Sequence, residues 1–153
     1  MVGILMARWW IFRADPARYD LPRALNVLSE ILWPVVGAAG GISPGDTVML
    51  WSDKPAPGIY GVATVTAPPS PTMGPEFDPF WLTEPAAWGV YCPLRVDRSL
   101  SGEPVLADEL DRGGALDSAA ARGPIVSVTE RHQVSLTTTL ATRGWTPAQP
   151  GSD

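Results

Sequence analysis

The stretch that most limits the possible folds is residues 43–66, which predicts a β-hairpin. Ser43-Pro44-Gly45-Asp46 is a turn sequence, because proline fixes φ and glycine supplies the positive φ of a tight reversal. Thr47–Trp51 and Ile59–Val65 are rich in β-branched and aromatic residues and predict the two strands. The intervening residues 53–58 contain two prolines, which remove two backbone donors and interrupt the ladder.

One position in the second predicted strand has no side chain. Gly61 is typical of a β-bulge or of a close approach by another group. Together with Trp51 at the end of the first strand, this bare position allows two interpretations. The hairpin is either an ordinary core element or a platform on which a ligand binds.

The length of 153 residues favours one domain, which we expect over residues 1–146 with a flexible tail at 147–153. The 17 prolines and 15 glycines favour short strands and many turns over a helical bundle. Seven tryptophans need partly or fully buried positions, which are common in cores, interfaces and ligand pockets.

Two elements are expected before the hairpin. Arg8–Arg13 is apolar on both faces, which predicts a central strand with Trp9 and Trp10 pointing in opposite directions. Asp20 is expected to cap a helix that ends before Trp33. The apolar stripe of this helix, at helical spacing, consists of Leu21, Leu25, Leu28, Ile31 and Leu32.

Residues 67–87 form a long proline-dense segment that contains Phe77, Phe80 and Trp81. A loop with aromatic residues is either the wall of a pocket or a cover over a sheet edge. Trp88–Val96 then predicts a strand with Pro93 inside it, and therefore an edge strand or a bulged one.

The C-terminal third predicts several short elements. In chain order they are a helix at Val105–Leu110, a weaker helical turn at Ala115–Arg122, a strand at Ile125–Val128, a short strand at His132–Leu136, and a closing turn or short helix at Leu136–Gly144. This succession of strands and short helices favours a small α+β barrel.

The charge pattern argues against one class of partner. Ten arginines and one lysine stand against 16 acidic residues, for a net charge of −5, and the arginines form no basic stripe along the sequence. A protein that binds nucleic acid mainly through phosphates is expected to carry such a stripe. Recognition of a single base in a pocket is compatible with this composition.

The cysteine count and the apolar segments of the sequence indicate a cellular location. Cys92 is the only cysteine, so an internal disulfide is excluded and a reducing cytoplasm is expected. The apolar N-terminus is interrupted by Arg8 and lacks a cleavage site, and no run is long enough to span a membrane. We therefore expect a soluble, cytoplasmic protein with no membrane partner.

No motif of a known enzyme class is present. The sequence has no phosphate-binding glycine loop, no G-x-S-x-G elbow and no histidine pair at metal spacing, and His132 is the only histidine. We expect a non-catalytic protein without a metal or another cofactor.

Three segments resemble the EVE domain family. They are Trp10-Ile11-Phe12-Arg13-Ala14-Asp15-Pro16 followed by Tyr19, then the hairpin from Ser43 to Ala63, and finally Phe77-Asp78-Pro79 with the Trp88–Val96 strand, the Pro104–Leu110 helix and Gly123-Pro124-Ile125. Their order and spacing are similar to those of the family over residues 9–140. The resemblance implies a PUA-like mixed β pseudo-barrel flanked by short helices, related to the YTH and ASCH domains.

The same resemblance implies a function, the recognition of a modified nucleobase in DNA or RNA. By position, Trp33 and Trp81 resemble two walls of an aromatic cage. Arg13, Ala14 and Asp15 would line its floor, and Trp51 with Ser52 would close one side.

The chemistry of these residues suits a base. Two indoles can stack on the two faces of a flipped base, and the carboxylate of Asp15 can accept from an exocyclic amino group of cytosine or adenine. Because the chain is acidic, a partner protein that supplies nucleic-acid affinity is one expectation. Two alternatives remain open: a structural or protein-interaction domain whose tryptophans are core, and an RNA-binding module that does not depend on modification.

Overall fold

The computed structural model describes residues 7–35, 40–114 and 123–147, and these form a mixed α+β fold. The elements in chain order are β1 (Trp9–Ala14), α1 (Leu21–Val27), β2 (Glu30–Pro34), β3 (Thr47–Ser52), β4 (Gly58–Val65), β5 (Ser70–Met73), β6 (Trp88–Ser99), β7 (Val105–Leu106), α2 (Ala107–Gly113), β8 (Ile125–Val128) and α3 (Glu130–Ala141). The prediction of an α+β fold with short helices around a mixed sheet is confirmed.

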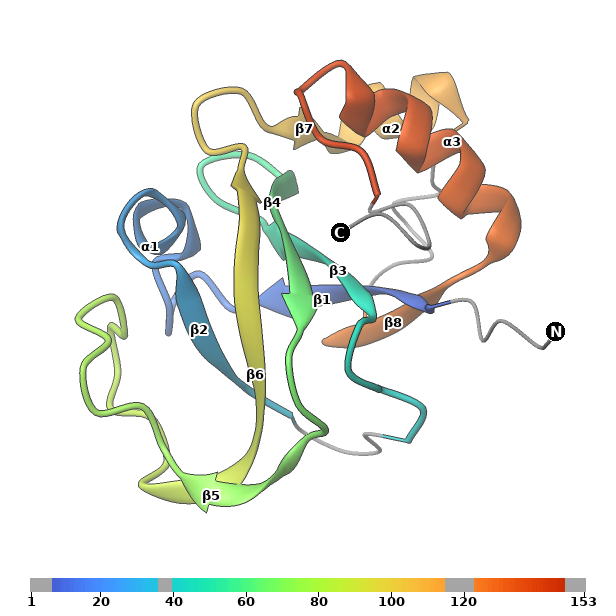
Figure 1. Cartoon of the computed structure of the whole chain (residues 1–153). Coiled ribbons are helices and arrows are strands. Elements are labelled where there is room, and N and C mark those ends of the chain that lie inside the picture. The colour runs from blue at the N-terminus through green and yellow to red at the C-terminus, as the bar shows by residue number, and fades with distance from the viewer. Residues whose placement is uncertain (1–6, 36–39, 115–122, 148–153) are drawn as a thin grey trace, which may run out of the picture.

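The strands form one eight-stranded sheet (Figure 1). Its main path runs β2-β6-β4-β3-β1-β8, with β5 paired to β6 and β7 paired to β4. The pair β1–β3 is parallel and the pairs on either side of it are antiparallel. The sheet is not closed into a barrel: β2 and β8 are the two ends of the path, and the expected barrel is an open, curved sheet.

The predicted hairpin is present as β3 and β4. Its register shifts beside Gly61, where Leu50 pairs with Gly61 but Trp51 pairs with Ile59. A Cβ at Gly61 would lie 2.8 Å from the Cδ1 of Leu25. The bare position therefore coincides with a bulge and also admits helix α1, so Leu25 occupies the space that a ligand would need.

The first helix is shorter than its leucine stripe predicts. Helix α1 ends at Val27, and Leu28 has extended backbone angles. Residues 30–34 instead form β2, in which Ile31 and Trp33 are buried while Glu30 is exposed. The apolar residues Ile31 and Trp33 also fit the two-residue period of a strand. Pairing with β6 decides for the strand over the helix. Trp33 is thus a strand residue.

Residues 88–96 are predicted to form an edge strand or a bulged one; the edge position is wrong, whereas the pairing of this strand with β4 contains a bulge-type register shift. Strand β6 runs from Trp88 to Ser99 and lies between β2 on one side and β4 with β5 on the other. Pro93 is tolerated because it falls between the segment paired to β5 and the segment paired to β4, where no ladder bond requires its N–H. The register irregularity of β6 lies further along, opposite Val62 and Ala63.

The segment of residues 67–87 is less irregular than predicted, because it contains β5. Its aromatic side chains have different environments. Phe80 is buried, Trp81 is partly buried, and Phe77 is 89% exposed, so the expectation of burial is wrong for Phe77.

A strand was expected at residues 132–136, and this is wrong because they lie within α3. The side chain of Thr129 caps this helix by accepting from the N–H of His132. Leu136 and Leu140, four residues apart, are fully buried against the sheet. This amphipathic spacing is helical, and the threonines of the segment did not prevent a helix.

The remaining C-terminal predictions have mixed outcomes. Residues 105–106 form strand β7 and the helix starts later, at Ala107, as α2. The strand predicted at Ile125–Val128 is β8. The expected helical turn at 115–122 lies outside the described residues, as do 36–39 of the connection into the hairpin and 148–153 of the expected tail.

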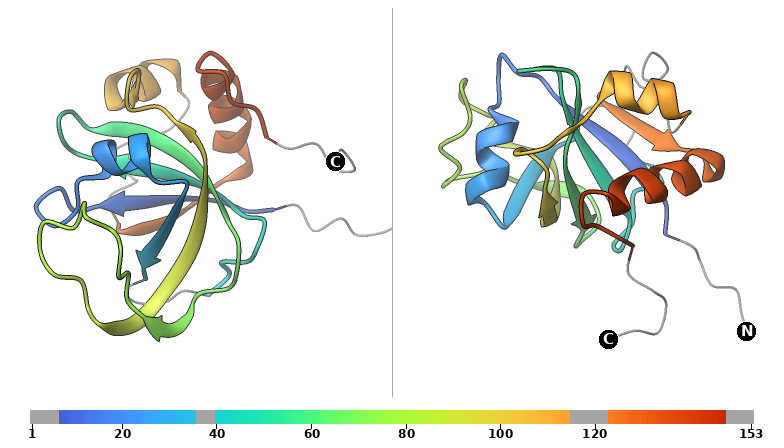
Figure 2. Two further views of the ribbon diagram at one scale, coloured as in Figure 1. Left: turned by 60° about the vertical axis from the view of Figure 1, so that its left-hand side comes forward. Right: turned by 90° about the horizontal axis from the view of Figure 1, so that it is seen from above.

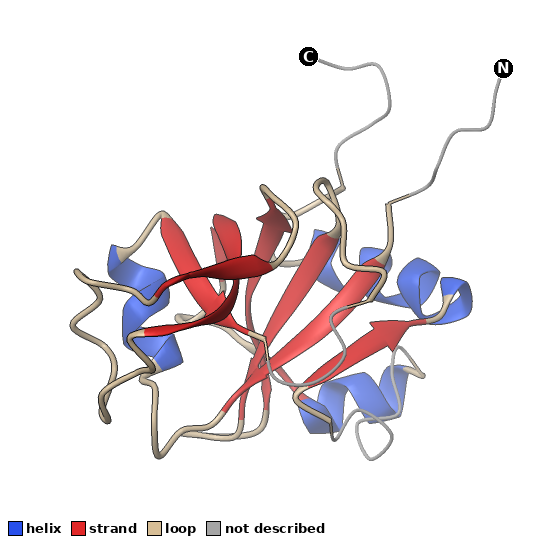
Figure 3. Ribbon diagram, turned by 90° about the horizontal axis from the view of Figure 1, so that it is seen from below, coloured by secondary structure: helices blue, strands red, loops and turns tan. Residues whose placement is uncertain are grey.

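The sheet has a hydrophobic core on each face. Helix α1 lies on one face, and α2 and α3 lie on the other (Figures 2 and 3). The α1-side core consists of Trp10, Phe12, Ala14, Tyr19, Leu21, Ala24, Leu25, Ile31, Trp33, Val35, Ile42, Val48, Leu50, Tyr60, Ala63, Val65, Phe80, Cys92 and Leu94. The α3-side core consists of Trp9, Ile11, Met49, Trp51, Ile59, Val62, Leu100, Val105, Leu110, Val128, Leu136, Leu140 and Trp145. Trp9 and Trp10 therefore point to opposite faces, as predicted.

Candidate functional site

A pocket of about 260 Å³ opens where the sheet fails to close. It takes residues from β2, at one end of the sheet path, and from β1 and the start of β8, at the other end. The turn between β1 and α1 and the loop before β6 complete it. Its lining is Arg13, Ala14, Asp15, Arg18, Tyr19, Ile31, Trp33, Pro34, Trp81, Pro85, Ala86, Tyr91, Pro124 and Ile125.

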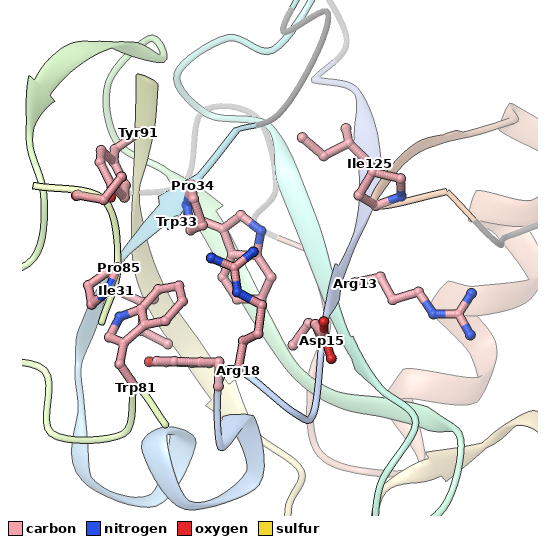
Figure 4. Close-up of a pocket in the computed structure, with 14 residues that line it drawn as sticks. Arg13, Asp15, Arg18, Ile31, Trp33, Pro34, Trp81, Pro85, Tyr91 and Ile125 are labelled. Atoms are coloured by element: carbon pink, nitrogen blue, oxygen red, sulfur yellow. The ribbon is translucent and has the colours of Figure 1, made fainter. Parts of the chain in front are cut away.

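Three aromatic residues form a connected wall of this pocket. The ring of Tyr19 lies 4.7 Å from that of Trp81 and 6.2 Å from that of Trp33, measured between centroids. Trp33 also packs against Phe12 at 6.0 Å and is only 5% exposed, so it belongs to the core and lines the pocket at once. Figure 4 shows Trp81 and Trp33 approaching the pocket from two different segments.

The loop that carries Trp81 is attached to the turn that carries Tyr19. The backbone N–H of Asp20 donates to the carbonyl of Phe80 at 2.9 Å, and that of Leu82 donates to Arg18 at 2.8 Å. The hydroxyl of Tyr19 donates to Asp78 at 2.7 Å. Burial, followed by this bond to a carboxylate, raises the pKa of Tyr19 far above its ordinary value, so the phenol stays protonated and keeps the loop in place.

Two charged side chains in the pocket are available to a ligand. Asp15 is exposed, and its Oδ1 accepts from the backbone N–H of Ala17 at 2.9 Å in a local turn. Arg18 is exposed, and its side chain makes no hydrogen bond or ion pair within the described residues. Both come from the same turn after β1.

Arg13 lines the pocket in a different way. Its guanidinium binds the carboxylate of Asp53 at 2.7 Å and extends away from the aromatic wall (Figure 4). Burial alone would raise the pKa of Asp53, but the hydrogen bonds from Arg13 and Trp51 and the charge of Arg13 outweigh it and hold the pKa below its ordinary value. The charge of Arg13 is thus neutralised within the protein.

The structure brings together five of the seven residues expected at the site. Trp33, Trp81, Arg13, Ala14 and Asp15 all line the pocket.

The other two expected residues do not line it. Trp51 is 2% exposed in the α3-side core and donates through Nε1 to Asp53 at 3.1 Å. Ser52 is buried and its hydroxyl donates to the carbonyl of Lys54 at 2.9 Å. Their place at the end of β3 puts them close to β1 in register, but Trp51 projects from the other face of the sheet.

Sequence reasoning missed the other nine lining residues, of which three have polar side chains: Arg18, Tyr19 and Tyr91. Tyr91 is buried under the loop and donates to the carbonyl of Ala86 at 2.6 Å. Burial raises the pKa of Tyr91, and the positive charge of Arg18 acts against that rise. The position of Arg18 between Pro16 and Tyr19, within the segment that carries the motif, is the sequence feature that could have indicated its place in the pocket.

A second hollow, of about 280 Å³, lies beside the same loop. Its rim carries the carboxylates of Glu30, Glu76 and Asp78 and the exposed ring of Phe77. Three acidic groups disfavour an anionic ligand there. The first pocket is the better candidate for a nucleotide-like molecule.

Other reactive groups have structural environments. Burial, with a smaller contribution from Asp46, raises the pKa of Cys92 to about 12, and its side chain is fully buried. A thiol of this kind is not a nucleophile at neutral pH. Within the described ranges, no three histidine, cysteine or carboxylate side chains are grouped as metal ligands would be.

Comparison with known proteins gives similarity of fold. The chain is similar to the solved structure of a hypothetical protein from Leishmania major, at 16% identity and a TM-score of 0.64, over 91% of this chain and 98% of that one. A protein from Agrobacterium tumefaciens matches at 16% identity and a TM-score of 0.62, over 96% and 99%. A protein from Pseudomonas putida matches at 17% identity and a TM-score of 0.59, over 85% and 97%.

No family model and no curated protein matches the sequence. At these identities the solved structures establish that the fold occurs in other proteins along nearly their whole lengths. In the part of the chain that is described, no helix has the length and apolar character needed to cross a membrane.

Proposed function

We propose that this protein recognises a modified nucleobase, in DNA or RNA, in the pocket between β1 and β2, without chemical conversion. The observation that carries the proposal is the meeting of Trp33, Trp81 and the available carboxylate of Asp15 in one opening. The motif resemblance to EVE domains, and through it to PUA-like proteins, supports the same function.

The size and lining of the pocket suit one base. Pockets for drug-sized ligands measure about 300–1,000 Å³, and this pocket is slightly smaller, at about 260 Å³. Its lining is mainly apolar and aromatic, with a few polar groups, as small-molecule sites are. Stacking of a base on an aromatic side chain contributes about 1–3 kcal/mol.

The carboxylate of Asp15 supplies selectivity. An acceptor in the pocket lining favours bases with an exocyclic amino group, and cytosine with its N4 and adenine with its N6 are two such bases. A methyl or hydroxymethyl group would then contact apolar lining such as Pro34 or Ile125. A cytoplasmic location completes the proposal, because the single cysteine fits a reducing compartment.

The test is a titration of intrinsic tryptophan fluorescence. Cytidine, 5-methylcytidine, 5-hydroxymethylcytidine, adenosine and N6-methyladenosine are added as nucleosides and within short DNA and RNA strands. We expect saturable quenching by one modified species. Trp81→Ala and Asp15→Ala should abolish it, because the first removes a wall and the second removes the acceptor.

Trp88→Ala is the matched control, since Trp88 is 65% exposed and outside the pocket lining. Trp33 is tested as Trp33→Phe, because its indole is part of the core. If no base quenches the fluorescence, and Trp81→Ala unfolds the protein as judged by circular dichroism, the aromatic wall is structural and the base-recognition proposal is wrong.

A second function is favoured by one observation. The exposed side chains of Met73 and Trp88 are directly opposite each other on β5 and β6. Large exposed apolar side chains that lie together are typical of protein interaction sites. Loss of a partner on Trp88→Ala, with unchanged base binding, would establish that this surface acts in addition to the pocket.

A further inference from the structure

The pocket contains one positive charge that no described residue neutralises, that of Arg18. Arg13, the other arginine of the pocket, is paired with Asp53 at 2.7 Å. The side chain of Arg18 has no hydrogen bond or ion pair among the described residues. In Figure 4 its guanidinium projects over the pocket beside Trp33, away from the direction taken by Arg13.

The carboxylate of Asp15 does not neutralise Arg18 either. The two residues belong to one turn, in which the N–H of Arg18 donates to the carbonyl of Asp15 at 2.9 Å, yet their side chains form no ion pair. The pocket therefore presents a free acceptor and a free cation to the same ligand. A ligand with an amino group at one end and an anion at the other matches this arrangement.

We infer that the ligand is a nucleotide rather than a free base or nucleoside, and that Arg18 binds its phosphate while Asp15 accepts from its base. The inference rests on the proposed function and names the ligand class of that site. A guanidinium suits this role because its fork of N–H groups matches the oxygens of a phosphate. A single contact of this kind also suits an acidic chain, because it needs no basic stripe.

The environment of Arg18 supports an anion at this point. The phenol of Tyr91 lies close enough to feel the charge of Arg18. The hydroxyl of Tyr91 donates a hydrogen bond to the carbonyl of Ala86, and within the described residues no hydrogen bond joins it to Arg18. Of the three acidic side chains of the neighbouring loop, Glu76 and Asp78 belong to the second hollow, and Glu84 lines neither that hollow nor this pocket.

The experiment compares matched ligands that differ only by phosphate. 5-Methyl-2′-deoxycytidine and N6-methyl-2′-deoxyadenosine are titrated beside their 5′- and 3′-monophosphates, at 50 and 200 mM salt. We expect at least one monophosphate to bind about tenfold or more tightly than its nucleoside, because a hydrogen bond to a charged group contributes an affinity gain of this size. This advantage should shrink at the higher salt concentration.

Arg18→Gln should remove the phosphate advantage and leave nucleoside affinity within about twofold of the wild type. Arg18→Lys should retain part of the advantage, since it keeps the charge but loses the fork. Arg112→Gln is the matched control: it removes the same charge from α2, on the other face of the sheet, where the one side-chain partner of Arg112 among the described residues is a carbonyl of its own helix.

The outcomes separate the two proposals. Equal binding of nucleoside and monophosphate by the wild type would overturn the role of Arg18 and leave base recognition intact. A loss of nucleoside affinity in Arg18→Gln as large as the loss of nucleotide affinity would place Arg18 on the base and also overturn it. Absence of binding by every nucleoside and nucleotide would overturn the proposed function itself.

Discussion

The two cores on either side of the sheet use tryptophan differently. In the α3-side core, Trp9 and Trp145 pack edge to face at 5.6 Å, and Trp51 donates to Asp53. All three are buried and none lines the described pockets. Helices α2 and α3 cover this core (Figure 2), and we call it the closed core because none of its buried residues lines either pocket.

The α1-side core is complete at one end and open at the other. At its closed end, Trp10 donates through Nε1 to the buried carboxylate of Asp46 at 2.9 Å. At its open end, the Nε1 of Trp81 is buried and has no partner within the described residues. The buried N–H of Trp81 in the pocket wall therefore lacks a hydrogen bond. Native proteins most often leave buried polar groups unsatisfied at functional sites.

The largest effect should come from the closed core. Leu140→Ala removes a fully buried side chain of α3 and should lower the free energy of unfolding by about 2–5 kcal/mol. Urea unfolding measures this change. Because the α3-side core does not reach the pocket, the ligand affinity of the folded protein should not change, and a large change in affinity would contradict the separation of the two cores.

The attachment of α1 to the open core should be the next most sensitive feature. Gly61→Ala places a Cβ 2.8 Å from the Cδ1 of Leu25 and should cost about 1–3 kcal/mol, because the buried Leu25 side chain must repack. Gly102→Ala is the control, since a Cβ there meets no atom within 4 Å. Equal thermal shifts for the two variants would show that the contact with Leu25 is easily relieved.

The three indole donors permit a graded comparison. Trp10→Phe leaves Asp46 without one of its donors and should cost about 1–3 kcal/mol more than Trp81→Phe, which removes an N–H that has no partner. Trp51→Phe should fall between them, because Asp53 keeps its bonds from Arg13. Chemical denaturation of the three variants gives the order directly, and Trp81→Phe as the most damaging of them would contradict the assignment of an unpaired donor.

The smallest effect concerns the ion pair between Arg13, which lines the pocket, and Asp53, which also accepts from Trp51 of the α3-side core. Asp53→Asn should cost less than about 1 kcal/mol at neutral pH, because both side chains are partly exposed. The folded state lowers the pKa of Asp53, so its contribution is present above the ordinary carboxyl pKa and is lost as the pH falls through the folded value. The stability difference between wild type and variant should therefore disappear in acid, and a difference that grows toward low pH would show the opposite sign.

The sequence by itself determined the hairpin. The proline and glycine of the turn at residues 43–46 and the prolines between the strands act through the local backbone, so β3 and β4 were predicted at nearly their observed bounds. The same holds for the start of α1, where Asp20 caps the first turn by accepting from Arg23. The opposite directions of Trp9 and Trp10 followed from strand geometry alone.

The tertiary structure decided what depends on a distant partner. Residues 30–34 fit a helix or a strand by period, and pairing with β6 made them β2. By sequence, Pro93 favours an edge or bulged strand. In the structure β5 pairs with β6 before Pro93 and β4 pairs with β6 after it, so an interior strand accommodates the proline.

The composition of the site was decided in the same way. Five of the seven expected residues meet in the pocket. Arg13, Ala14 and Asp15 do so because the motif at the end of β1 is contiguous and local, whereas Trp33 and Trp81 reach it from β2 and from the loop before β6. Trp51 was misplaced because the face to which a strand residue projects is set by register against neighbouring strands. Arg18 was missed because the availability of a charge depends on which other charges fold beside it: Asp53 pairs with Arg13, and no carboxylate of the described residues pairs with Arg18.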